Sequence, residues 1–421
     1  MKASISKSEI SGQVAAPSSK SYTIRALMCA ALARGESEII APLTSDDTEA
    51  SLDVLSRVGI NIDRYRDQWL VKGGIFTEPA SDLFCRESGA TLRFMAAISS
   101  LIPGECRLTS APSLAERPIE PLIQALKQLG VDCRYQGKEK PVIVNGGRLT
   151  GGAAELPGNI SSQYVSALLF ISPFAEEGVR IRLTTPLESQ PYVLMTMECL
   201  KNFGINVKSD ENLREFEIEK QSYRPGKYTV EGDWSSASYL LALGALSGEV
   251  CVENLNIKSL QGDSMILQFL KDMGSSVTIG KNSVTVTKSG LKAIRADLTE
   301  CTDLLPTVAI LAAAAEGTSE FSGIERTRIK ESDRVSALRE GLEAMGIEVI
   351  EDSNRLIITG SPVRGAEINS HNDHRIAMAF SLLGTVTGDT VINEAECVAK
   401  TYPEFWDTLK SLGGRIELND E

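Results

Sequence analysis

The chain has 421 residues, 42% of them hydrophobic, which suits two globular domains that each bury a core. Its 56 acidic and 43 basic residues give a net charge of −13, which argues against general nucleic-acid binding. No apolar run is long enough to span a bilayer, no signal-peptide pattern opens the chain, and the eight cysteines lack C-x-x-C spacing. We therefore expect a cytoplasmic protein with reduced, mostly buried thiols and no membrane partner. We also expect it to act as a monomer.

A helix-ending phrase recurs along the chain: Leu, two polar or small residues, an apolar residue, then Gly. Its six copies end at Gly59, Gly130, Gly204, Gly274, Gly346 and Gly413. Each copy predicts an amphipathic helix that ends in a left-handed glycine, because glycine adopts a positive φ without steric cost. An alternating, strand-like segment such as Ile205–Val207 follows each copy. Copies spaced 67 to 74 residues apart indicate an internal repeat.

Short polar clusters run in step with this repeat, each before a small, apolar helical run. They lie at Ser18–Ser21, Glu87–Gly89, Ser161–Gln163, Ser235–Ala237, Thr302–Asp303 and Asp373–His374. Ser, Thr and Asp at such positions cap helices, and helix N-termini attract anions through unpaired N–H groups and the helix dipole. Six such clusters in six related units predict helix starts that converge on one place.

The repeat also predicts the domain organisation. Only 49 residues remain from Asp373 to the end, less than one repeat, while Ala3–Ser6 near the N-terminus is strand-like. We infer that the N-terminal segment completes the sixth unit. One domain of three units spans 20–231, and a second comprises 1–19 and 232–421. Two crossings make a hinge, and the gap between the domains is the expected ligand site.

Several basic residues fall at helix starts and loop–helix junctions, a placement that solubility does not require. They are Lys20, Arg25, Arg93, Arg117, Arg334, Arg375 and Lys400. Arginine binds phosphate and carboxylate through two parallel hydrogen bonds, and lysine acts as a mobile point charge. The set predicts a site for one or two small ligands that carry several negative charges.

Other motifs for common cofactors are weak. Lys20–Ser21 lacks the glycine spacing of a P-loop, and no G-x-G-x-x-G follows a strand. His371 and His374 stand three residues apart without a further ligand cluster, so a metal site is a minor alternative. No cysteine lies beside a histidine, which makes a cysteine nucleophile equally weak. We expect neither a metal nor a cofactor.

Eight motifs occur in the order typical of one family. They are Pro17–Arg25, Ser88–Arg93, Glu116–Pro118, Ser161–Gln163, Glu231–Tyr239, Lys330–Arg334, Asn372–Arg375 and Ala399–Pro403. Over nearly its whole length the chain resembles the 5-enolpyruvylshikimate-3-phosphate synthases, which are enolpyruvyl transferases. The resemblance implies an α/β (α+β) fold of two globular domains, each an inside-out barrel of three βαβαββ-type units, joined by two hinge strands. It also implies transfer of the enolpyruvyl group from phosphoenolpyruvate to the 5-hydroxyl of shikimate 3-phosphate, with release of phosphate.

The resemblance further implies which residues bind the two substrates. Shikimate 3-phosphate would contact Lys20, Ser21, Arg25, Ser161, Ser162, Gln163, Ser189, Tyr192, Asp303 and Lys330. Phosphoenolpyruvate would contact Lys20, Gly89, Arg117, Gln163, Arg334, Arg375 and Lys400. The proton transfers would fall to Asp303 towards the hydroxyl and Glu331 towards the methylene carbon, with Lys20 as a third candidate. A helix cap for Asp303 and an ion pair for Glu331 are the structural alternatives.

Three positions depart from the family pattern, and two other functions stay open. Glu87 and Ala90 stand where Asn and Thr are usual, and Arg326 stands where an Asn often contacts shikimate. We expect moderate sensitivity to glyphosate, which in that family occupies the phosphoenolpyruvate position. The nearest alternative is the enolpyruvyl transferase acting on UDP-N-acetylglucosamine, which uses a Lys-Asn pair and a loop Cys, whereas here Ser21 follows Lys20. The other is a non-catalytic binder of phosphorylated metabolites.

Overall fold

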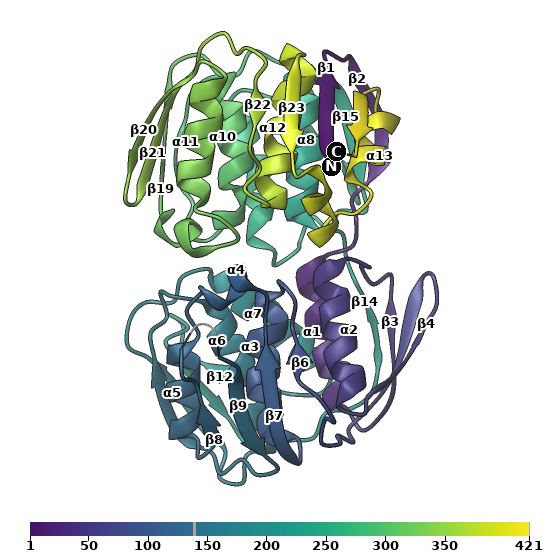
Figure 1. Cartoon of the computed structure of the whole chain (residues 1–421), viewed down its shortest axis with the longest axis vertical. Helices are drawn as coiled ribbons and strands as arrows, with labels where there is room; N and C mark the ends of the chain where they lie inside the picture. Colours follow the sequence, from purple (N-terminus) through teal and green to yellow (C-terminus); the bar gives the residue numbers. More distant parts are fainter. Residues whose placement is uncertain (138–139, 421) are drawn as a thin grey trace. The chain divides into compact units, whose positions relative to one another are not determined.

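The computed structural model describes residues 1–137 and 140–420, and the chain divides into two compact units (Figure 1). Unit 1 consists of Met1–Pro17 and Glu231–Glu421, and unit 2 of Ser18–Val230. Among the described residues, each unit contains three four-stranded sheets. Within the described residues, no helix is long and apolar enough to cross a membrane.

Unit 2 contains three sheets and seven α-helices among its described residues. Its sheets, in strand order, are β14 (Lys227–Thr229), β3 (Gly35–Ile40), β5 (Gln68–Gly73) and β4 (Asn61–Arg64); β6 (Leu83–Phe84), β7 (Gly104–Thr109), β9 (Val142–Gly146) and β8 (Asp132–Arg134); and β10 (Gly152–Leu156), β11 (Val179–Leu183), β13 (Glu215–Ile218) and β12 (Lys208–Ser209). Its helices are α1 (Lys20–Leu32), α2 (Asp46–Arg57), α3 (Gly89–Ile98), α4 (Pro112–Ala115), α5 (Glu120–Gln128), α6 (Ser162–Ile171) and α7 (Gln190–Asn202).

Unit 1 repeats this plan. Its sheets are β22 (Glu367–Ile368), β23 (Thr390–Asn393), β1 (Lys2–Ser6) and β24 (Arg415–Asn419); β16 (Ser276–Ile279), β17 (Ser283–Thr287), β15 (Gly248–Glu253) and β2 (Ile10–Ala15); and β18 (Arg295–Asp297), β19 (Thr318–Ser322), β21 (Arg355–Thr359) and β20 (Glu348–Asp352). Its α-helices are α8 (Trp234–Ser247), α9 (Ile266–Asp272), α10 (Leu305–Ala313), α11 (Arg334–Ala344), α12 (His374–Thr387) and α13 (Phe405–Ser411). Its 3-10 helices are η3 (Gly262–Met265), η4 (Thr302–Leu304), η5 (Glu325–Ile329) and η6 (Ala395–Lys400).

All six sheets share one topology, in which a parallel pair of strands is extended by two antiparallel strands. In the first sheet β14 runs parallel to β3, which pairs antiparallel with β5, and β5 with β4. The N-terminal strands β1 and β2 complete two of the three sheets of unit 1. N-terminal β1 lies between β23 and β24, so that Ala3 faces both Ile392 and Leu418, as the purple strand beside the yellow one in Figure 1 shows. The predicted α/β class with three repeats in each unit is confirmed.

The six helix-ending glycines behave as predicted. Their φ values lie between +84° and +101°, in the left-handed region that favours glycine. After the first of them, the Ile60 N–H donates to the Leu55 carbonyl at 3.1 Å, and equivalent bonds follow the other five glycines. These bonds satisfy carbonyl groups that a helix C-terminus otherwise leaves unpaired. Each cap therefore ends its helix and turns the chain into the next strand.

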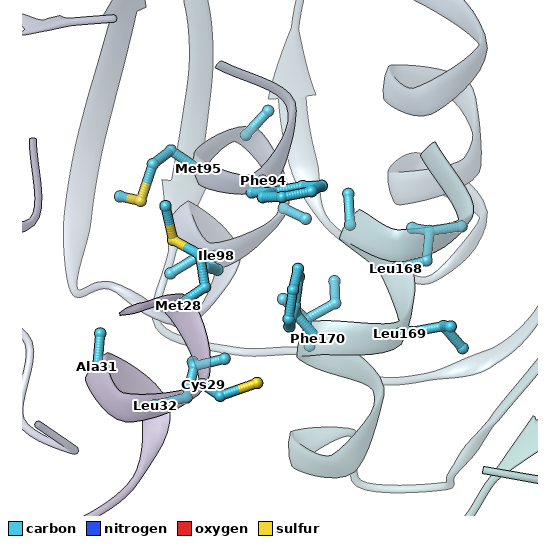
Figure 2. Close-up of a cluster of buried hydrophobic side chains, with 14 of the residues drawn as sticks. Met28, Cys29, Ala31, Leu32, Phe94, Met95, Ile98, Leu168, Leu169 and Phe170 are labelled. Carbon is cyan, nitrogen blue, oxygen red and sulfur yellow. The ribbon is translucent and has the colours of Figure 1, made fainter. Parts of the chain in front are cut away.

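The helices that follow the polar clusters form the centre of each core. In unit 2, α1, α3 and α6 are apolar on nearly all sides, and Figure 2 shows Met28, Phe94 and Phe170 from these three helices in one cluster. The Phe94 and Phe170 rings meet edge to face, with centroids 5.0 Å apart. In unit 1, α8, α10 and α12 contact one another in the same way. These helices are buried along most of their length, and polar clusters lie in or just before their first turns.

The thiols are reduced and mostly buried, as expected. All eight cysteines are free, and seven of them are buried. Burial raises the pKa of the Cys29 and Cys85 thiols above its usual value, which keeps these groups neutral and unreactive.

Candidate active site

The first turn of α1 places Lys20 beside a buried carboxylate. Ser19 caps the helix, its hydroxyl accepting from the Tyr22 N–H. The Lys20 ammonium donates to Asp47 at 2.9 Å, and the Asp47 side chain is only 6% exposed. Sequence analysis missed Asp47, although it stands in the acidic first turn of α2, where carboxylates are favoured. The pair holds the lysine head in place while leaving it partly exposed.

Arg25 lies one turn further along α1 and is held on several sides. Its guanidinium donates to the Thr196 hydroxyl at 2.8 Å and to the carbonyls of Tyr192 and Ser21 at 3.1 and 3.0 Å. It also lies over the Tyr192 ring, 5.7 Å from the centroid. Ser189, the residue before α7, is buried and has a left-handed φ of 54°. Such backbone strain in a residue other than glycine is typical of functional sites. Four predicted residues are therefore brought together here.

The starts of α3 and α6 are joined by an arginine. Arg93 of α3 donates to the Gln163 side-chain oxygen at 2.6 Å, and its guanidinium lies over the Tyr164 ring. Ser161 caps α6, accepting from the Gln163 N–H, and Ser162 is the first residue of that helix. Ser161, Ser162 and Gln163 thus form one polar helix start, and Arg93 fixes the side chain of the third.

Gly89, the first residue of α3, lies against the arginine that follows α4. A Cβ built on Gly89 would lie 3.2 Å from Arg93 Nη1, 3.6 Å from Leu114 and 3.7 Å from Arg117 Nη1. Arg117 is 8% exposed. Glu87, two residues earlier, accepts a hydrogen bond from the Ser113 hydroxyl of α4. The Glu87 carboxylate therefore binds to α4, the short helix that precedes Arg117.

The other two departures from the family pattern have local explanations. The start of α3 depends on Ser88 and Thr91 rather than on Ala90, since the Ser88 hydroxyl accepts from both the N–H and the hydroxyl of Thr91. This helix start is therefore capped without a hydroxyl at position 90. Arg326 donates to the Thr299 carbonyl at 3.0 Å, a contact within its own repeat.

In unit 1 the predicted residues form one ion-pair network around Asp303. Its carboxylate accepts from Arg334 at 2.9 Å, from Arg375 at 3.1 Å and from Lys330 at 3.4 Å. Asp303 lies inside the short η4 helix, and the N-cap residue of that helix is Cys301. The interpretation of Asp303 as a helix cap is therefore wrong. A carboxylate that three cations surround has an electrostatic function that capping does not explain.

Glu331 extends this network to the last predicted cation. Its carboxylate accepts from Arg334 at 2.6 Å and lies 3.7 Å from the ammonium of Lys400. The expected ion pair of Glu331 is therefore present. Glu331 and Lys400 are both largely buried, with side chains 13% and 10% exposed. All six predicted residues of unit 1 lie in a single network.

Asp373 is a further member that sequence analysis identified only as a helix cap. It does cap α12, accepting from the Arg375 N–H at 2.9 Å. The same carboxylate accepts from Arg334 at 2.8 Å and from the Ser332 hydroxyl at 3.0 Å. Asp373 is fully buried, so its second role fixes Arg334, which is itself only 1% exposed.

The charges in this network determine the ionisation of Asp303. Burial alone would raise the pKa of the Asp303 carboxyl, but the charges of Arg375, Lys330 and Arg334 outweigh it and hold the pKa well below its usual value. Burial lowers the pKa of Lys330, and the charge of Asp303 opposes that effect. Asp303 is therefore a carboxylate at neutral pH, and it keeps the cations in fixed positions.

The two histidines do not form a metal centre. His371 lies 3.2 Å from Glu340, whereas His374 is buried at the start of α12. Among residues 1–137 and 140–420, no group of three or more His, Cys, Asp or Glu side chains is placed to hold a metal ion.

Comparison with known sequences assigns the family. The family model described as EPSP synthase (3-phosphoshikimate 1-carboxyvinyltransferase) matches residues 5–409. The chain belongs to the EPSP synthase family. A 3-phosphoshikimate 1-carboxyvinyltransferase of Dehalococcoides mccartyi is 52% identical over 418 residues, 99% of either chain. Another from Methanosarcina acetivorans is 42% identical over the whole of both chains.

Solved structures support the same assignment. An EPSP synthase from Acinetobacter baumannii matches the whole of both chains with a TM-score of 0.85 and 28% identity. An enolpyruvyl transferase from Streptomyces tendae matches with a TM-score of 0.80 at 19% identity, which shows a shared fold. The two-domain inside-out α/β fold predicted from the sequence is therefore confirmed.

Proposed function

We propose that the residues described above carry out the reaction of the EPSP synthase family. The chain transfers the enolpyruvyl group of phosphoenolpyruvate to the 5-hydroxyl of shikimate 3-phosphate, and phosphate is released. The observation that carries this assignment to particular residues is the network of unit 1, in which Asp303 and Glu331 lie among four cations. A protein that only bound anions would gain nothing from these carboxylates, because they compete with the ligand for the same cations.

Unit 2 supplies the groups that suit shikimate 3-phosphate. The polar helix starts of α1 and α6 offer Ser21, Ser161 and Ser162, and hydroxyl and N–H groups of this kind bind phosphate and sugar-like oxygens. Arg25, Ser189 and Tyr192 lie together nearby, and Gln163 is fixed by Arg93. We assign these residues, with Lys20, Asp303 and Lys330, to the shikimate substrate.

The phosphoenolpyruvate contacts are assigned to cations of both units. Unit 2 provides Lys20, Gly89, Arg117 and Gln163, and unit 1 provides Arg334, Arg375 and Lys400. Gly89 leaves space for a ligand because its hydrogen in place of a Cβ keeps Arg93 and Arg117 uncrowded. Arg334 and Arg375 pair with carboxylates, so an anion that binds them takes over some of these bonds.

That exchange of partners prepares the two proton transfers. When the substrates bind Arg375 and Lys330, Asp303 loses part of its positive surroundings and becomes a stronger base for the 5-hydroxyl. When phosphoenolpyruvate takes Arg334 and Lys400 from Glu331, that carboxyl is protonated more readily. Glu331 then gives its proton to the methylene carbon as the 5-oxygen bonds to the neighbouring carbon. Loss of a methyl proton and of phosphate restores the double bond, and Lys20 is the third candidate for these transfers.

The activity test measures phosphate release with each substrate alone and with both together. Phosphate should appear only with both, and the product should carry an enolpyruvyl ether at the 5-position by proton NMR. UDP-N-acetylglucosamine replaces shikimate 3-phosphate in a parallel reaction, which should give no phosphate. Turnover with the nucleotide sugar, or binding of both substrates without turnover, would favour one of the two alternative functions.

We also expect a monomer that acts in the cytoplasm and that glyphosate inhibits in competition with phosphoenolpyruvate.

A further inference from the structure

Asp263 is a further buried carboxyl near Asp303 that has no place in the mechanism above. Asp263 belongs to η3, is only 4% exposed, and its Oδ1 atom has no hydrogen-bond partner among the described residues. An unpaired, buried carboxylate oxygen is costly, because burial removes the water that would solvate it. The position of this carboxyl therefore needs an explanation.

The surroundings of Asp263 connect it to the network. Its carboxyl lies beside the hydroxyl of Ser235, which in turn accepts from the Arg375 guanidinium. The other side of the same guanidinium donates to Asp303. The charged or titratable groups that face Asp263 are Asp303 from η4, Arg375 from α12, Asp233 at the start of α8, and Cys301 before η4. Among these four groups, Arg375 is the one that carries a positive charge.

The charge of Asp263 changes the balance of the site. Three carboxylates bond directly to the cations of unit 1: Asp303, Glu331 and Asp373. They pair with four cations, Lys330, Arg334, Arg375 and Lys400. Asp233 instead caps α8 by accepting from the Ser236 N–H at 2.7 Å. An ionised Asp263 would offset part of the positive charge of Arg375 that an anion needs, whereas a neutral Asp263 would not.

We propose that Asp263 is a positioning residue that acts through Ser235 and Arg375 to set the positive charge offered to phosphoenolpyruvate. This inference rests on the proposed function of the cation network. Burial, and then the charge of Asp303, raise the pKa of Asp263 to about 7, so its protonation changes near neutral pH. As the pH rises through this value, Asp263 ionises and affinity for phosphoenolpyruvate falls. Asn is neutral and of similar shape, so Asp263→Asn should remove this dependence.

The test compares kcat/KM for phosphoenolpyruvate in wild type and Asp263→Asn between pH 6 and pH 8. The ratio of variant to wild type should be about one at pH 6 and rise to as much as about tenfold at pH 8, the limit for a single titrating group. Using the ratio cancels the titration of phosphoenolpyruvate itself. Asp272→Asn is the matched control, because Asp272 is an exposed acid on α9, and its ratio should stay constant. Ser235→Ala should reduce the effect of pH.

A second measurement follows stability without substrates. An acid with a raised pKa in the folded state destabilises the fold as the pH rises from the ordinary range of Asp, about 4, towards the raised value. The free energy of unfolding of Asp263→Asn relative to wild type should therefore increase over that range. A constant kinetic ratio in an active enzyme, or a constant stability difference, would overturn the inference alone. A wild type inactive with both substrates would overturn the proposed function, and the inference with it.

Discussion

Arg334 is the residue whose replacement tests the network most directly. It is 1% exposed and bonds to three carboxylates, Asp303, Glu331 and Asp373, at 2.6 to 2.9 Å. Arg334→Met keeps the side-chain length but leaves these carboxylates buried without their shared cation. Removing one partner of a buried ion pair costs about 3–5 kcal/mol, because the remaining charge stays desolvated. We expect Arg334→Met to lose at least that much of its free energy of unfolding.

Arg339 provides the matched control on the same helix. Its guanidinium pairs with Glu343 at 3.0 Å and Glu351 at 2.8 Å, but the side chain is 33% exposed. Surface pairs of this kind contribute about 0–1 kcal/mol, so Arg339→Met should be nearly neutral. Urea unfolding, followed by tryptophan fluorescence from Trp234 and Trp406 of unit 1 and Trp69 of unit 2, measures both variants. Hydrogen exchange should show that protection is lost in unit 1 and kept in unit 2.

The loss should also depend on pH with a definite sign. In wild type, burial would raise the pKa of Asp303, but the neighbouring cations outweigh burial and hold the pKa low. The Asp303 carboxylate therefore stabilises the fold above the ordinary pKa of Asp, and this stabilisation is lost as the pH falls. The difference between wild type and Arg334→Met should therefore be largest at neutral pH and shrink in acid. Adding Asp373→Asn to Arg334→Met should recover part of the loss, because one uncompensated charge is removed. Equal effects of Arg334→Met and Arg339→Met, or a loss that grows in acid, would refute this reasoning.

Three further predictions concern activity. Lys20→Ala should lower kcat/KM by about tenfold to a hundredfold, the value of one charge-assisted contact, and near-normal steady-state kinetics would remove Lys20 from the mechanism. Asp303→Ala should bind both substrates in calorimetry yet lose kcat, because the cations stay available while the base is absent; a loss of binding without a loss of kcat would contradict its role. Gly89→Ala should raise the inhibition constant of glyphosate far more than the KM of phosphoenolpyruvate, since the added methyl would lie 3.2 Å from Arg93 and crowd the longer ligand. Equal changes for both ligands would show that the pocket around Gly89 is misinterpreted.

Local signals in the sequence determined the repeat and its helix ends. A left-handed glycine cap depends on one residue and its near neighbours, so all six were predictable from Leu55–Gly59 and its copies. Hydroxyl and carboxylate caps at the helix starts are equally local, and Ser19, Ser161 and Asp373 occupy them as expected. The cations of the site were visible because they stand inside these local motifs.

Only the tertiary structure decided which distant groups meet. The sheet that contains β1 joins residues more than 400 positions apart along the chain, such as Lys2 and Asn419. Arg334 likewise meets Asp303 and Asp373 from different repeats. Such contacts depend on how whole elements pack, which no short motif encodes. Asp263 illustrates the limit most clearly, because its neighbours in sequence carry no signal of a site. Its burial near Ser235 and Arg375, which perturbs its ionisation, arises only when η3, α8 and α12 pack together.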